Sequence, residues 1–184
     1  MNKALDAIAG GWQLNGIIRV DTGRPITPFL NSPVAIPTYG QRPNLSGTLK
    51  RSGGSIENAI DKTGVNPNAP APGSYFANAG VDPSCGCPTA SSVLQIPAPY
   101  TLGTAPRAID TVRQPGTRNT TLSLFKEFPI REKMRIEYRF EAFNAFNHPH
   151  FNGPDSGVDS PTFGQISSLA ASERQVQMAL KFYW

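Results

Sequence analysis

The C-terminal segment, residues 174–184, places apolar and polar side chains at alternate positions. One series is apolar and consists of Val176, Met178, Leu180, Phe182 and Trp184. The positions between them are mostly polar and hold Gln175, Gln177, Ala179, Lys181 and Tyr183. Successive side chains of a β-strand point to opposite faces, whereas a helix would spread these residues around its circumference. The pattern therefore predicts a strand with one apolar face and one polar face.

Three further segments alternate in the same way. In residues 11–22 the apolar series is Trp12, Leu14, Gly16, Ile18 and Val20. In residues 134–146 an apolar series of Met134, Ile136, Tyr138, Phe140 and Ala142 opposes Arg135, Glu137, Arg139 and Glu141. Residues 119–128 alternate more weakly, because Phe125 breaks their pattern. This two-residue period predicts four strands in all.

The connections between these strands differ greatly in length. A short turn at residues 129–133 connects 119–128 to 134–146, so these two segments are predicted to form an antiparallel hairpin. The connection at about 28–116 is long and irregular and holds most of the 18 prolines, and a shorter irregular connection covers 148–163. Charged residues make up only 16% of the chain, against roughly 25% in average domains. A connection as long as 28–116 is uncommon inside a compact soluble domain.

Long and short connections alternate in the manner of a transmembrane β-barrel, which has long extracellular loops and short periplasmic turns. If the C-terminus is periplasmic, both long connections fall outside and the turn at 130–133 falls in the periplasm. No apolar run approaches the about 18 residues of a membrane helix, but a barrel strand needs only about 9–11. We therefore predict an all-β fold, in which antiparallel strands form the C-terminal segment of a transmembrane β-barrel with long irregular extracellular loops.

A barrel in a membrane assigns a role to each strand face. The polar residues would face the lumen, where opposite charges on neighbouring positions reduce repulsion. The lumen-facing residues that we predict are Arg135, Glu137, Arg139, Glu141, Gln175, Gln177 and Lys181. Aromatic residues at strand ends would form the girdles at the two membrane interfaces. These are Trp12, Phe128, Phe146 and Trp184.

Other classes of protein fit less well. A secreted β-sandwich that binds a partner, such as a carbohydrate, is the main alternative, but it predicts strands about every 8–12 residues. A hydrolase lacks a convergent set of groups, because Glu137 and Glu141 would lie about 13 Å apart on one strand face, too far for a glycosidase pair. The net charge of +4 comes from scattered basic residues, so no nucleic-acid partner is expected. We expect neither an enzyme nor a cofactor.

Two short motifs contain residue types that bind metals. His148 and His150 flank a proline, but a metal site needs three or four ligands, and only Asp155 lies nearby in sequence. Cys85 and Cys87 are the only two cysteines, which are too few for a cysteine-based zinc site. A loop disulfide and free thiols remain equal alternatives, because a one-residue spacer strains the geometry of the bridge. No metal site is therefore predicted.

Several motifs together resemble a known family. They are Gly11-Trp-Gln-Leu-Asn-Gly16, Thr22-Gly-Arg-Pro-Ile-Thr27, Arg113-Gln-Pro-Gly116, Leu122-Ser-Leu-Phe-Lys126, Arg139-Phe-Glu-Ala-Phe-Asn-Ala-Phe-Asn-His148, Phe163-Gly-Gln-Ile166 and Arg174-Gln-Val-Gln-Met-Ala-Leu-Lys-Phe-Tyr-Trp184. The combination resembles the C-terminal end of the Oar-like TonB-dependent transporters. The resemblance covers about residues 10–28 and 107–184, and the stretch that ends in His148 is its most specific part.

The resemblance implies an outer-membrane receptor that takes up a scarce ligand, with energy delivered by an inner-membrane TonB complex. It also implies contact with outer-membrane lipid and recognition by the barrel-assembly machinery, whose signal resembles Val176, Met178, Leu180, Phe182 and Trp184. The family's plug and energy-coupling box have no counterpart here, and four strands cannot close a barrel of about 22. Because residues 1–9 also lack a signal peptide, we expect residues 1–184 to be a C-terminal fragment that cannot transport alone.

Overall fold

The computed structural model describes residues 9–32, 41–62, 73–132, 134–170 and 173–184. The chain divides into two compact units. The first, which we call the sheet unit, comprises Met1–Asp21, Thr117–His150 and Ala171–Trp184. The second, which we call the loop unit, comprises Thr22–Gly116 and Phe151–Ala170. Among the described residues, no helix has the length and apolar character needed to cross a membrane.

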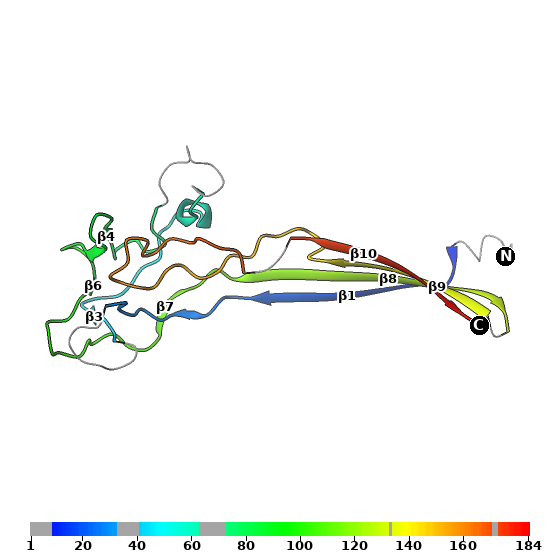
Figure 1. Cartoon of the computed structure of the whole chain (residues 1–184), viewed down its shortest axis with the longest axis horizontal. Coiled ribbons are helices and arrows are strands. Elements are labelled where there is room, and N and C mark those ends of the chain that lie inside the picture. The colour runs from blue at the N-terminus through cyan, green and yellow to red at the C-terminus, as the bar shows by residue number, and fades with distance from the viewer. Residues whose placement is uncertain (1–8, 33–40, 63–72, 133, 171–172) are drawn as a thin grey trace. The chain divides into compact units, whose positions relative to one another are not determined.

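The sheet unit is one antiparallel sheet of four strands in the order β1-β8-β9-β10 (Figure 1). Its strands are β1 (Trp12–Asp21), β8 (Thr117–Arg131), β9 (Met134–Phe143) and β10 (Gln175–Tyr183). The four segments that alternate in sequence are therefore the four strands of this sheet. The predicted hairpin is the pair β8 and β9, and the four strands lie in the sheet in their chain order, with β1 and β10 at its two edges.

Strand β8 extends further than the sequence suggests, and this corrects the position of the turn. Pro129 to Arg131 belong to β8, so the described part of the turn to β9 is Glu132 alone, and residue 133 lies outside the described residues. The register between β8 and β9 shifts between Pro129 and Arg131. An irregularity of this kind accommodates a proline, which has no N–H for the ladder. A proline after an alternating segment predicts a turn, but here the bulge keeps it in the strand.

Strand β9 is shorter than predicted, because it ends at Phe143 and not at residue 146. Asn144 and Asn147 both have a left-handed backbone, with φ of 49° and 53°. The side chain of Asn144 also accepts a hydrogen bond from the His148 N–H and donates one to the His148 carbonyl, both at 3.0 Å. Phe146 therefore lies in a turn beyond the strand and is exposed.

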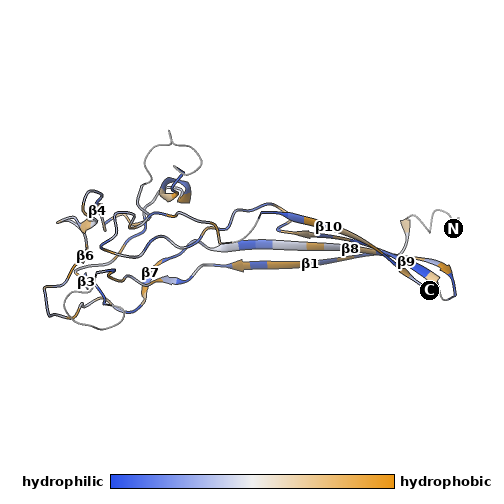
Figure 2. Ribbon diagram, in the orientation of Figure 1, coloured by the Kyte–Doolittle hydropathy of each residue, from blue (hydrophilic) through white to orange (hydrophobic). Residues whose placement is uncertain are grey.

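The register keeps the two faces of the sheet separate across all four strands. One row pairs Asn15 with Ser123, Ser123 with Glu141 and Glu141 with Gln177, and is polar throughout. The adjacent apolar row consists of Leu14, Leu124, Phe140 and Met178. Figure 2 shows hydrophilic and hydrophobic residues intermingled along these strands, as a two-residue period requires. The sheet thus has one mainly apolar face and one mainly polar face.

In its described residues, the loop unit contains short strands and one 3-10 helix. The elements are β2 (Pro25–Ile26), β3 (Asn44–Leu45), η1 (Ile56–Ala59), β4 (Val81–Asp82), β5 (Cys87–Pro88), β6 (Leu94–Gln95) and β7 (Ile109–Arg113). They pair as β2-β7, β3-β6 and β4-β5. Isolated bridges such as Phe29 with Gly157 and Ile60 with Ile166 join its two chain segments.

A hydrophobic core holds the loop unit together. Ile26, Leu94 and Ile166 are fully buried in it although they are far apart in sequence. The rings of Phe76 and Phe163 stack with centroids 4.9 Å apart. The connection at 28–116 is mostly irregular in its described residues, as expected, but those residues pack around this core. The sequence did not reveal it, because strands of two residues leave no period to detect.

Candidate functional site

The apolar face of the sheet is exposed to its surroundings. Leu14, Ile18 and Leu180 lie on this face, and each residue is 71–74% exposed. A soluble sheet packs such a face against a core, and a contiguous exposed apolar surface marks contact with a membrane or a partner. The face therefore provides a surface suited to lipid.

Aromatic residues gather at one end of the apolar face. Trp12 at the start of β1 pairs with Lys126 on β8, and Lys126 pairs with Tyr138 on β9. Phe128 and Phe182 both pair with Ile136 in the next row. The predicted interface residue Trp184 follows β10 and stacks on Phe182, with centroids 6.1 Å apart. Trp12, Phe128 and Trp184 thus occupy the same end of the sheet, whereas Phe146 follows the opposite end of β9.

Lys126 is the charged residue within this aromatic group. Its ammonium lies 4.7 Å from the Trp12 ring centroid and 5.1 Å from that of Phe128. It donates a hydrogen bond to the Gly10 carbonyl at 2.9 Å, and only 2% of the residue is exposed. Aromatic faces attract a cation, and more strongly when water is excluded. These contacts explain how a lysine is tolerated on a mainly apolar face. The position of Lys126 on that face was visible in the sequence, but its enclosure by aromatic rings was not.

The polar face carries the residues predicted to line a lumen. Arg135, Glu137, Arg139 and Glu141 of β9 share this face with Gln175, Gln177 and Lys181 of β10. The Glu137 carboxylate accepts hydrogen bonds from Nε of Arg139 and, at 2.9 Å, from the Tyr183 hydroxyl. The Gln177 amide donates to Glu141. The structure therefore brings the predicted residues together on one face, and their lumenal position remains a prediction.

Aromatic rings complete the polar face. The guanidinium carbon of Arg135 lies 4.2 Å from the Tyr183 ring centroid, and that of Arg139 lies 5.0 Å from the Phe125 centroid. The pair of Arg139 and Phe125 lines an open hollow of about 400 Å³. It is lined by Gln13, Asn15, Phe125, Glu127, Glu137 and Arg139, together with Gly11 and Lys126. Phe125, which interrupts the sequence alternation, is thus a partner of Arg139 in a hollow that the sequence did not predict.

The two histidines do not form a metal site in the described chain. His150 is buried, and its Nε2 lies 2.8 Å from the Arg118 carbonyl oxygen. The backbone of His148 is held by Asn144. Nowhere in the described ranges do three or more His, Cys, Asp or Glu side chains converge as metal ligands.

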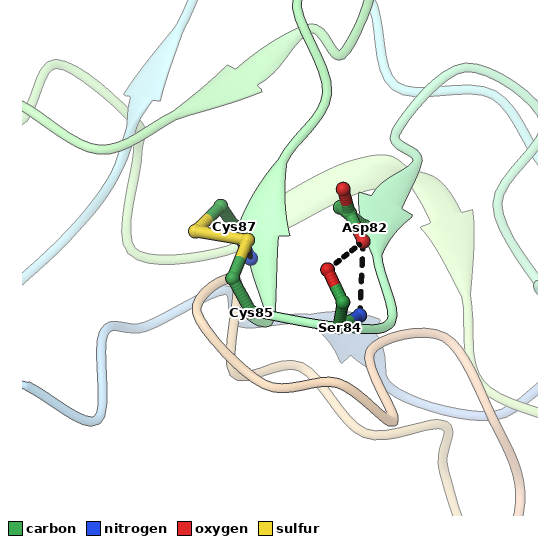
Figure 3. The surroundings of a disulfide bond; sticks show 4 residues. All are labelled: Asp82, Ser84, Cys85 and Cys87. Atoms are coloured by element: carbon green, nitrogen blue, oxygen red, sulfur yellow. Dashed lines mark hydrogen bonds between the residues drawn. A yellow bond between two sulfur atoms is a disulfide. The ribbon is translucent and has the colours of Figure 1, made fainter.

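Cys85 and Cys87 form a disulfide at the tip of the β4-β5 hairpin (Figure 3). Of the two states that the sequence left open, the structure has the bridged one. In the same turn the Asp82 carboxylate accepts hydrogen bonds from the Ser84 hydroxyl at 2.6 Å and the Ser84 N–H at 2.9 Å. These two bonds lower the pKa of Asp82 below its ordinary value. The disulfide therefore closes a turn that is also held by local hydrogen bonds.

Comparison with known families identifies the class of protein. Residues 1–177 match the model of a family described as outer membrane beta barrel domain. The chain belongs to this family. Membership confirms the all-β barrel fold class and the location in the outer membrane, and it decides against a secreted β-sandwich. No curated protein and no solved structure matches the chain.

Proposed function

We propose that this outer-membrane chain is the C-terminal barrel portion of an Oar-like TonB-dependent transporter that takes up a scarce ligand. The observation that carries the proposal is the register of the sheet, which aligns an apolar face and a polar face across β1, β8, β9 and β10. Such a sheet is suited to separate lipid from a water-filled lumen. The motifs that resemble Oar-like TonB-dependent transporters, including the stretch that ends in His148, support the proposal of this particular kind of barrel.

The proposed partners follow from the two faces and the ends of the sheet. Lipid would contact the apolar face, and the barrel-assembly machinery would recognise β10 with Trp184. The unpaired edges of β1 and β10 would join further strands of the barrel, since an open sheet edge is not tolerated in lipid. The TonB complex would act through a part of the protein that precedes residue 1. In this proposal the chain carries no catalytic role and does not transport alone.

A transport experiment tests the proposal even though the ligand is unidentified. One host strain lacks the segment of the gene that encodes residues 1–184, and a second lacks the TonB protein. Both strains and the parent grow in the same complex medium, and the compounds left in the spent medium are compared by mass spectrometry. We expect at least one compound to be depleted by the parent and retained by both mutants. TonB-dependent uptake would be contradicted if the first mutant depleted every compound that the parent depletes. It would also be contradicted if every compound retained by the first mutant were still depleted by the TonB mutant.

A further inference from the structure

The hollow on the polar face of the sheet combines an arginine, an aromatic ring and two amide side chains. Arg139 and Phe125 come from neighbouring strands, where they are directly paired in the register. Gln13, from β1, pairs with Phe125 on its other side, and Asn15 follows two residues later on the same face. All four line the same hollow. Three strands therefore contribute hydrogen-bonding and stacking groups to one place.

Arg139 is held in a fixed orientation by its neighbours. Its Nε donates to one oxygen of Glu137, and its guanidinium lies over the Phe125 ring. The other oxygen of Glu137 accepts from the Tyr183 hydroxyl, so both carboxylate oxygens are engaged. The Glu137 side chain is only 9% exposed, whereas that of Arg139 is 38% exposed. An enclosed carboxylate thus orients a guanidinium that remains accessible.

The terminal nitrogens of Arg139 are available for a ligand. Within the part of the chain that the structure describes, its hydrogen bonds involve Nε alone. The second acidic residue of the hollow, Glu127, lies 3.8 Å from Arg135, which reduces its competition for Arg139. A guanidinium presents paired donors that match the two oxygens of a carboxylate or a phosphate. The amides of Gln13 and Asn15 could donate to further oxygens of the same group.

We infer that this hollow binds an oxyanion group, carboxylate or phosphate, of a small-molecule ligand, with Arg139 as its main anchor. The inference rests on the proposed function, in which the polar face lines the lumen, and names the chemistry of the ligand there. Glu137 and Phe125 act as positioning residues, since they hold the guanidinium and do not themselves supply donors to an anion. The ring of Phe125 also excludes water from one side of the guanidinium, which strengthens the charged hydrogen bonds.

Chemical modification of arginine tests whether an oxyanion binds at Arg139. The complete gene product in detergent micelles is treated with phenylglyoxal, and the modification rate of each arginine within residues 1–184 is followed by peptide mass spectrometry. Acetate and inorganic phosphate serve as separate probes, so that the two oxyanion sources are distinguished. We expect one of them to slow the modification of Arg139 by about tenfold at ten times its Kd. Arg19, an exposed arginine on the polar face that pairs with Asp21 at 3.4 Å, serves as the internal control and should change little.

Two variants test the positioning roles of Glu137 and Phe125 separately from the binding role of Arg139. Glu137→Gln and Phe125→Leu should each reduce the protection of Arg139 while its basal modification persists, and circular dichroism verifies that the sheet remains formed. Absence of protection, equal protection of Arg19, or an Arg139 that is unreactive without probe would overturn the inference. So would protection by a glutamate-rich peptide alone, which would indicate a protein segment as the occupant. Protection in a chain that fails the transport test would leave the anion site standing and reject the proposed function, so the two failures are distinguishable.

Discussion

At the scale of single residues, Asn144 has a clear structural role in the motif of residues 139–148, which is the most specific motif of the chain. Its left-handed backbone turns the chain out of β9, and its amide bridges the N–H and carbonyl of His148. Asn147 repeats the left-handed conformation, and its side-chain oxygen accepts from the Arg174 N–H at 3.2 Å, next to the start of β10. Asparagine tolerates this conformation better than other non-glycine residues. The motif therefore has a structural reason, namely the end of one strand and the approach to the next.

Asn144→Ala should destabilise the sheet unit by about 2–4 kcal/mol, because it loses two hydrogen bonds of a buried side chain and adds left-handed strain. Asn144→Gly loses the same bonds but relieves the strain, so its loss should be smaller by about 1–2 kcal/mol. Denaturant unfolding of the complete gene product in lipid vesicles gives both free energies. If the glycine variant were the less stable of the two, strain at residue 144 would have no part in the effect.

At the scale of the elements, the loop unit depends on contacts between its two chain segments. Asp155 illustrates the local bonding, because its carboxylate accepts from the Gly157 N–H and from the hydroxyls of Ser160 and Thr162. Nearby in sequence, the Asp159 carboxylate reaches the other segment and accepts from the N–H groups of residues 31 and 32, both at 2.7 Å. Carboxylates thus replace regular strand pairing where the strands are too short to supply it.

Stability of the loop unit should depend on pH through Asp155. Burial alone would raise the pKa of Asp155, but the hydrogen bonds from Ser160, Gly157 and Thr162 together hold it below the ordinary value of 3.8. A lowered pKa in the folded state contributes stability that is complete above the unfolded value and is lost as the pH falls through the folded value. We therefore expect the loop unit to lose stability below pH 3.8.

Thermal unfolding of the chain in detergent, followed by tyrosine near-ultraviolet dichroism between about pH 2 and pH 6, measures this dependence. Tyr75 is a suitable reporter, because it is buried in the core of the loop unit and its hydroxyl donates to the Arg113 carbonyl at 2.8 Å. Asp155→Asn should flatten the acid limb of the profile, and Asp110→Asn, at an exposed position on β7, should not. Identical acid limbs in the native chain and in Asp155→Asn would contradict the assignment.

At the scale of the whole molecule, the two faces of the sheet decide how the chain meets its surroundings. Adjacent residues of β1 provide a matched comparison. Ile17 and Ile18 are the same residue type and are similarly exposed, at 72% and 74%. Ile17 pairs with Thr121 and belongs to the polar face, whereas Ile18 pairs with Thr120 and belongs to the apolar face. Only the direction of the side chain distinguishes them.

Arginine at these two positions should therefore have unequal effects. Ile18→Arg places a charge on the lipid face, which costs about 2–4 kcal/mol near the middle of the membrane, whereas Ile17→Arg places it on the polar face at little cost. The amount of heat-modifiable protein in the outer-membrane fraction, for the complete gene product, measures assembly of each variant. A greater loss for Ile17→Arg, or equal losses, would contradict the assignment of the faces.

The sequence by itself determined the parity of each strand and therefore both faces of the sheet. Alternation is a local property, because side-chain direction in a strand repeats every two residues regardless of partners. It correctly placed Arg135, Glu137, Arg139 and Glu141 on one face, and it marked Phe125 as an exception.

Only the tertiary structure decided the rest. Pro129 stays within a strand because a bulge accommodates it, and Ile26, Leu94 and Ile166 meet in a core through contacts that no local pattern encodes. The pairing of Phe125 with Arg139 likewise depends on the register between β8 and β9. Contacts between distant residues depend on how chain segments meet in space, whereas the sequence pattern reports only which way each side chain points.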